Sequence, residues 1–183
     1  KVFISQKNLL NKKKTAITYI EIDDANFSLE KKDLKFLKNK SKKKFSNKKI
    51  EINKSNIFLK NNLNETIAII KITKAFFFFD NKNLLNLLKS KGRVFNIPFN
   101  LNFSKEFDST KVENLSITAE TLKLNISNKS NNENNNFKNG KNIISFLNST
   151  VKTDYKIEDD TVVFSSTDSK IKNTEVNYSG KLS

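Results

Sequence analysis

The side chains that could perform chemistry in this 183-residue chain are mainly carboxylates. Asp23-Asp24 and Asp159-Asp160 are adjacent pairs, and Glu113 and Glu120 lie seven residues apart. Acid–base catalysis of the glycosidase kind needs two carboxylates held across a cleft, whereas adjacent aspartates between strands are typical of turns. We therefore predict that the chain is not an enzyme and has no catalytic residue.

The residue types that most catalytic and metal centres require are missing from the sequence. The chain has no His and no Cys, which excludes a Ser-His-Asp triad, a cysteine nucleophile, zinc, haem or iron–sulfur ligation, and disulfides. Its three glycines are too few for a glycine-rich phosphate loop. We predict no cofactor and no metal.

Basic residues dominate the charge, with 34 Lys and Arg against 19 Asp and Glu and a formal net charge of +15. Arg93 is the single arginine, although specific readers of phosphates and bases favour arginine for its bidentate fork. Lys, Asn, Ile and Phe have AT-rich codons, so the lysine excess also fits an AT-biased genome. We do not expect nucleic acid to be the main partner.

One segment concentrates the positive charge, because residues 31–49 contain ten lysines and one acidic residue. Such a run is either a solvated loop or a patch for anionic lipid headgroups or RNA. The candidates for contact with an anionic surface are Lys42, Lys43, Lys44, Lys48 and Lys49.

Alternation of apolar and polar residues is the dominant pattern, and it predicts an all-β fold. It is clearest over 95–103, where the odd positions are Phe, Ile, Phe, Leu and Phe and the even positions are Asn or Pro98. Proline lacks a backbone N–H, so we expect Pro98 at an edge or bulge. Weaker alternation over 143–157 predicts another strand, and further strands are predicted over 16–23, 66–79, 122–127 and 175–179.

Composition predicts the segments between the strands. The Lys-, Ser- and Asn-rich segment 38–49 and the Asn-rich segment 128–142 are predicted to be loops. Four leucines between positions 84 and 88, followed by Gly92, predict one short helix near 83–90.

A degenerate repeat, in which four residues separate an isoleucine from an apolar-x-apolar triplet, begins at Ile22, Ile52, Ile117 and Ile157. Most of the intervening residues are turn formers, so each copy predicts a strand, a turn and a second strand. The start-to-start spacings of 30, 65 and 40 residues indicate a hairpin repeat rather than a solenoid of fixed period.

The region from 50 to 183 resembles the AsmA-like family of Gram-negative envelope proteins, of the AsmA, TamB and YhdP type. The resemblance rests on 52–62 leading into 65–70, an acidic turn at Asp80, the stretch 84–88 and the run from Gly92 to Phe99. A second unit of the same kind covers 155–164 and 176–182. In the family, an Ile-x-x-Gly-x-Ile-x-Leu-x-Asp strand-turn precedes a hairpin and then Gly-x-Val-x-x-x-Pro-Phe. This chain departs from the pattern at the turn glycine, and it contains no N-terminal membrane helix.

The resemblance implies an elongated, curled sheet of repeated antiparallel hairpins with an apolar groove that binds lipid. Such a sheet would carry phospholipid between the inner and outer membranes and support outer-membrane assembly. The groove candidates alternate in the predicted strands: Ile67, Ile69, Phe95, Ile97, Phe99, Leu101, Phe103, Leu122, Leu124, Ile126, Val162 and Phe164. A closed β-sandwich or barrel would show the same alternation. A basic module for nucleic acid or anionic surfaces and a ligand-free structural repeat are the alternative functions.

The same resemblance implies a place in the cell envelope, on the periplasmic side of the inner membrane. Its partners would be phospholipid acyl chains, the remainder of a longer parent chain that carries the membrane anchor, and other envelope proteins. The sequence patterns divide the chain into an N-terminal β segment with the Lys-rich loop (1–49), an AsmA-like β unit (50–127), the Asn-rich loop (128–142) and a further β unit (143–183). We expect the last unit to continue beyond this segment.

Overall fold

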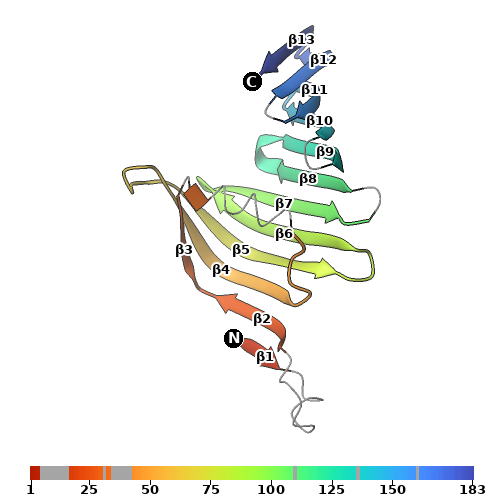
Figure 1. The fold of residues 1–183 in the computed structure, drawn as a ribbon. Helices are drawn as coiled ribbons and strands as arrows, with labels where there is room; N and C mark the ends of the chain where they lie inside the picture. Colours follow the sequence, from red (N-terminus) through yellow and green to blue (C-terminus); the bar gives the residue numbers. More distant parts are fainter. Residues whose placement is uncertain (5–16, 31, 34–42, 109–110, 135–136, 160) are drawn as a thin grey trace. The chain divides into compact units, whose positions relative to one another are not determined.

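The protein is an all-β chain, as predicted. The structure is a computed structural model that describes residues 1–183 except 5–16, 31, 34–42, 109–110, 135–136 and 160 (Figure 1). Its thirteen strands form one mixed sheet built largely of antiparallel hairpins. The chain divides into two compact units, Lys1–Asn96 (unit 1) and Ile97–Ser183 (unit 2). Among the described residues, no helix is long and apolar enough to cross a membrane.

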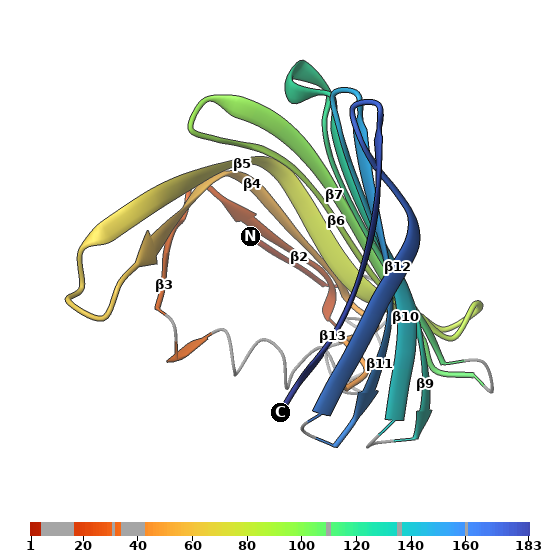
Figure 2. The same cartoon turned by 90° about the horizontal axis from the view of Figure 1, so that it is seen from above.

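The described part of unit 1 contains six strands, in the order β1-β2-β4-β5-β6 with β3 also paired to β4. Their bounds are Val2–Ile4 (β1), Ile17–Asp23 (β2), Asn26–Leu29 (β3), Lys49–Lys60 (β4), Thr66–Asp80 (β5) and Leu85–Val94 (β6). Figure 2 shows that the long strands β4 and β5 bend along their length. A register shift in β5 between Ile72 and Lys74 accounts for part of this bend, because a bulge kinks its strand.

The first two copies of the sequence repeat lie side by side. Strands β2 and β3 both pair with β4 in parallel at an offset of 30 residues, so that Ile22 lies opposite Ile52 and Leu29 opposite Leu59. The 30-residue spacing of the repeat therefore equals the offset between the paired residues of these neighbouring strands. These two copies do not form the separate hairpins that the repeat predicted.

Both copies kink at the same place. Asp24 and Lys54 have φ values of 53° and 45°, and the chain resumes as a strand after each. The two kinks are joined, because the Ala25 amide donates to Ser55 Oγ (3.0 Å) and the Asn56 amide donates to the Ala25 carbonyl (2.8 Å). Ser55 is almost fully buried, so the junction is an integral part of unit 1.

Unit 2 is an antiparallel meander in which each strand pairs with the next in sequence. Its strands are Ile97–Glu106 (β7), Val112–Ala119 (β8), Leu124–Asn134 (β9), Phe137–Phe146 (β10), Ser149–Glu158 (β11), Thr161–Ile171 (β12) and Thr174–Leu182 (β13). A single 3-10 turn, Glu120–Leu122, joins β8 to β9. The repeat copies that begin at Ile117 and Ile157 form the β8–β9 and β11–β12 hairpins, as the sequence predicted.

The helix predicted near 83–90 is wrong, because this segment begins β6. Asp80 accepts hydrogen bonds from the amides of Lys82 (2.8 Å) and Asn83 (3.3 Å), which closes a turn before β6 starts at Leu85. The strand then pairs with β5 over its whole length. The leucine spacing that predicted a helix instead places apolar side chains on both faces of β6. Leu87 opposes Phe78 on one face, and Leu88 opposes Phe77 on the other.

Two further predictions in unit 2 are also wrong. The Asn-rich segment 128–142 is not a loop but the greater part of the β9–β10 hairpin, and residues 135–136 lie outside the described residues. The alternating segment 143–157 is not one strand, because a turn at Leu147 separates β10 from β11. Pro98 is the second residue of β7, and the pairing of β7 with β8 begins at Asn100.

Turns in this chain use left-handed backbone without glycine. Eleven described residues other than glycine have positive φ, and no described glycine does. They include three large apolar residues, Leu84, Phe95 and Leu147, whose side chains are exposed. Residues with a Cβ are disfavoured in this conformation, so the hairpins carry local backbone strain.

Candidate apolar binding surface

The pleat of unit 2 gathers apolar side chains on one face of the sheet. The cross-strand register places one aliphatic residue from each of β7 to β11 in a single row: Leu101, Ile117, Ile126, Ile144 and Val151. Directly opposed residues share a face of the sheet, so this row is continuous across five strands. We call it the aliphatic row, and the face that carries it the apolar face of unit 2.

Other apolar residues extend this face on both sides of the aliphatic row. Phe103 opposes Leu115, and Leu124 opposes both Ala119 and Phe146. Toward β13, the same face carries the opposed pairs Tyr155–Phe164, Ile157–Val162 and Val162–Leu182.

Eight of the twelve predicted groove residues belong to the apolar face of unit 2, and all eight are half-buried: Ile97, Phe99, Leu101, Phe103, Leu124, Ile126, Val162 and Phe164. Leu122 lies in the 3-10 turn between β8 and β9. The remaining three, Ile67, Ile69 and Phe95, belong to unit 1. The prediction missed Leu115, Ile117, Ile144 and Val151, although alternation over 115–119 was a usable signal.

The opposite face of unit 2 is polar, with opposed pairs such as Asn100–Thr118, Asn102–Ser116 and Lys141–Asp154. Among the described residues of unit 2, Ala119 is the only buried apolar one. In a β-sandwich, a facing sheet would bury the apolar side chains, whereas here they remain half-buried. The apolar face therefore retains contact with solvent.

Unit 1 also has an apolar face, defined by opposed pairs that include Ile20–Ile50, Ile50–Phe77, Phe27–Ile57 and Ile57–Ile70. Ile72 and Phe79 on this face are buried. Residues 43–48 cover one end of it. The buried Asn86 side chain accepts a hydrogen bond from the Phe45 amide (2.8 Å) and donates one to the Lys43 carbonyl (2.8 Å).

Part of the Lys-rich segment is therefore packed on the sheet. The Phe45 ring meets the Phe77 ring edge-on, with centroids 5.7 Å apart, and the Lys44 ammonium lies 4.9 Å from the Phe79 ring centroid. Lys49 begins β4, and its ammonium lies 4.7 Å from the Phe76 ring centroid. Of the other anionic-surface candidates, Lys43 is exposed, Lys48 is half-buried, and Lys42 lies outside the described residues.

Glu51 is a buried carboxylate on the opposite face of unit 1. It forms ion pairs with Lys74 (2.7 Å) and Lys49 (3.0 Å). Hydrogen bonds from Lys74 and then Lys49 lower the pKa of Glu51 to about 2, against the opposing effect of burial. Burial, with a contribution from Glu51, raises the pKa of Tyr19. The two ammonium groups balance the charge of the ionised carboxylate, and this ion-pair network gives Glu51 a structural role rather than that of an acid or base.

The three groove candidates of unit 1 also lie away from its apolar face. Ile67 and Ile69 alternate with Ala68, Ile70 and the buried Ile72, so their side chains occupy the opposite face. Together with Phe95, Lys71 and Arg93 they line a hollow of about 430 Å³. We call it the outer hollow; its two cations were not among the predicted site residues.

No family model, curated protein or solved structure matches this chain. Its function is therefore inferred from the geometry of its own faces.

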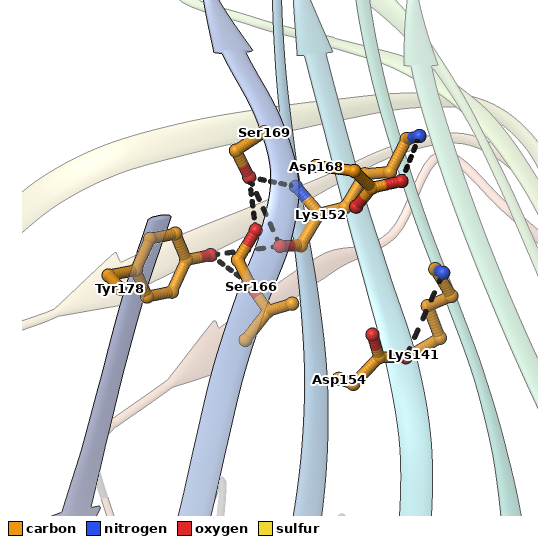
Figure 3. Close-up of polar contacts among 8 residues, drawn as sticks. Lys141, Lys152, Asp154, Ser166, Asp168, Ser169 and Tyr178 are labelled. Atoms are coloured by element: carbon orange, nitrogen blue, oxygen red, sulfur yellow. Dashed lines mark hydrogen bonds and ion pairs between the residues drawn. The ribbon is translucent and has the colours of Figure 1, made fainter. Parts of the chain in front are cut away.

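Two serine hydroxyls come together beside the Lys152 backbone at a bulge in β12, but not in a catalytic arrangement (Figure 3). The Ser169 Oγ accepts a hydrogen bond from the Lys152 amide (2.8 Å) and lies 2.6 Å from Ser166 Oγ. The Lys152 ammonium instead pairs with Asp168 (2.6 Å). These hydroxyls complete the backbone hydrogen bonding at the bulge. Among the described residues, no group of three carboxylates is placed to hold a metal ion.

Two buried serines of unit 2 should respond oppositely to the same substitution. Ser169→Ala is expected to destabilise the chain by about 2 kcal/mol, because it leaves the Lys152 amide without its partner. Ser130→Ala is expected to be neutral or to stabilise by about 1 kcal/mol, because Ser130 Oγ is buried with no hydrogen-bond partner among the described residues. Urea unfolding followed by circular dichroism measures both values. Equal losses in the two variants would contradict this assignment.

Proposed function

We propose that this chain is a non-enzymatic lipid-binding segment of an AsmA-like envelope protein. In this proposal the apolar face of unit 2 holds phospholipid acyl chains. The parent protein would then move phospholipid between the inner and outer membranes from the periplasmic side of the inner membrane.

The aliphatic row is the observation that carries the proposal. Neighbouring strands are about 4.8 Å apart, so a row across five strands is about 19 Å long. One leaflet of a bilayer has a hydrocarbon thickness of about 15 Å, half of the roughly 30 Å core. The row can therefore accommodate one extended acyl chain lying across the strands.

The chemistry of the two faces supports this choice of ligand. Each methylene group removed from water contributes about 0.8 kcal/mol, so an apolar surface can retain an acyl chain without any polar contact. The half-buried state of the row leaves it open to such a chain, whereas the polar face offers no comparable surface. Lys44 and Lys49, by contrast, contact phenylalanine rings of the chain itself, which disfavours the basic-module alternative.

Site-specific photo-crosslinking tests the proposal. A photo-reactive residue at Phe99 or Leu124 should label the acyl chains of phospholipid that co-purifies with the chain or is added as vesicles. The matched controls are Asn100 and Asn125, the next residues in the same strands, whose side chains lie on the polar face. Labelling at the first pair but not at the second supports an acyl-chain site. Equal labelling of both pairs, or none in folded protein, would leave a ligand-free structural repeat.

Substitution within the row gives an independent prediction. Ile126→Glu places a charge at the centre of the aliphatic row and is expected to reduce retained phospholipid at least tenfold, because an acyl chain would have to desolvate the carboxylate. Ser127→Glu adds the same charge on the polar face and should retain lipid at the level of the unmodified chain. Lipid is quantified by mass spectrometry after gel filtration. Undiminished lipid in the Ile126→Glu variant would exclude the row as the site.

A further inference from the structure

The outer hollow combines exposed apolar side chains with cations that have no acidic partner among the described residues. Its walls come from β5, the end of β6 and the turn that follows β6. Three large apolar side chains, Ile67, Ile69 and Phe95, line it together with Ala68 and the cations Lys71 and Arg93. None of the described residues that line it is acidic.

The two cations face each other across the strands. Lys71 lies directly opposite Arg93 in the antiparallel β5–β6 pair, and both side chains are exposed. Neither has an acidic partner in the part of the chain that the structure describes. Like charges in directly opposed positions destabilise a strand pair, and an anion bound between them would remove that repulsion.

The guanidinium group indicates which anion fits. Arginine presents a planar fork that binds phosphate through two hydrogen bonds, and lysine adds a point charge. Arg93 is the single arginine among 34 basic residues, and it stands in this hollow. Lys89 and Lys91 follow on the same face of β6 and are also exposed, so the hollow lies within a positively charged surface.

The apolar residues beside these cations are unusually exposed. Phe95 is 72% exposed, Ile67 61% and Ile69 40%, and Leu63 in the preceding β4–β5 turn is 78% exposed. Large apolar side chains that project beside lysine and arginine match the boundary between headgroups and acyl chains of a bilayer. A nucleic acid would use the cations but would leave the aliphatic side chains in water.

We propose that the outer hollow docks this chain onto a bilayer that contains anionic phospholipid. The phosphate lies between Lys71 and Arg93, and Phe95 and Ile67 enter the headgroup–acyl boundary. This surface is on the face of unit 1 opposite its apolar face, and it shares no residue with the aliphatic row of unit 2. It therefore adds membrane recognition to acyl-chain binding rather than restating it.

Vesicle co-sedimentation of the full chain tests the proposal. Binding to vesicles of phosphatidylcholine with phosphatidylglycerol should exceed binding to phosphatidylcholine alone and should weaken as salt is added. Each basic residue near an anionic membrane contributes about 1 kcal/mol, so Lys71→Gln with Arg93→Gln should weaken binding about thirty-fold. Phe95→Ser should weaken it several-fold on the mixed vesicles.

The control is Lys170→Gln with Lys181→Gln, which removes the same charge from exposed positions on the polar face of unit 2. An equal loss of binding in this control would show general attraction by the net charge and would overturn the proposal. So would equal binding to the two kinds of vesicle, or binding of RNA but not of vesicles through Lys71 and Arg93. Acyl-chain crosslinking at Leu124 should persist in the outer-hollow variants, so the two proposals can fail separately.

Discussion

Gly140→Ala is expected to destabilise the chain by about 3 kcal/mol. A Cβ at Gly140 would lie 2.6 Å from both Cζ and Oη of Tyr155 and 2.8 Å from the Lys129 carbonyl oxygen. The Tyr155 ring crosses β10 at this glycine, and its hydroxyl forms a hydrogen bond with Asn128 (3.0 Å). Because a backbone atom also blocks the methyl group, rotating the ring does not relieve the overlap, and overpacking of this kind costs about 1–3 kcal/mol or more.

Gly180→Ala is the matched comparison for this prediction. A Cβ there would meet only the Phe164 ring, with contacts of 2.5 to 3.1 Å. A ring can shift more readily than a carbonyl, so we expect a loss of about 1 kcal/mol, which Phe164→Leu in the same chain should recover. Urea unfolding followed by circular dichroism gives both numbers. A Gly140→Ala variant as stable as the unmodified chain would show that Tyr155 does not pack over β10.

The second large effect is expected at Glu51. Glu51→Gln should cost about 2 kcal/mol at pH 7, because it removes the partner of both Lys74 and Lys49 at a buried position. The ammonium groups remain partly exposed, which keeps the loss below that of a fully buried ion pair. Glu175→Gln, at an exposed position on β13, should change the unfolding free energy by less than about 0.5 kcal/mol.

The cost of Glu51→Gln should depend on pH in one direction. The pKa of Glu51 falls from 4.5 to about 2 on folding, so the unfolded chain binds the proton more tightly than the folded chain. The stabilisation is complete above the unfolded pKa and is lost as the pH falls from about 4.5 through about 2. The unfolding free energies of the unmodified chain and the Glu51→Gln variant, measured at pH 6, 4 and 2.5, should converge as the pH falls. A difference that stays constant or grows on acidification would contradict the ion-pair assignment.

Strand periodicity predicted the parts of the fold in which one face is apolar and the other polar. The alternation from Ile97 to Phe103 gave both the strand and the face, because a period of two leaves each side chain a single orientation. The 30-residue spacing between Ile22 and Ile52 was visible in the sequence. The spacing alone could not reveal the pairing, because the same interval fits two copies that pair in parallel and two copies that form separate hairpins.

Prediction failed where local composition and strand pairing indicate different structures. The leucines of 84–88 have a helical propensity that a two-turn helix cannot realise against a ten-residue ladder with β5. Asparagines over 128–142 are poor strand formers in isolation, yet Asn128 opposes Asn142 and receives support from Tyr155 across the sheet. Both outcomes depend on partners distant in the sequence.

The candidate surface was predictable in unit 2 and much less so in unit 1. Within β5 the apolar run continues on both faces, so Ile67 and Ile69 could not be distinguished by type from Ile70 and Ile72. The bulge after Ile72 shifts the alternation by one residue, which no composition-based pattern reveals. Arg93 was notable in the sequence as the single arginine. Only the strand register, which places it opposite Lys71, shows that the two cations lie together.

The strained left-handed turns are positions at which substitution can raise the stability of this protein. At positions such as Leu84, Leu147 and Lys172, a residue with a Cβ occupies a backbone conformation that glycine adopts freely. Each exchange for glycine removes strain of about 1 kcal/mol at a hairpin tip, without altering either face of the sheet. Higher thermal tolerance can therefore be engineered through the turns alone. The side chains of the proposed lipid site can then be varied in a more stable protein that tolerates their loss.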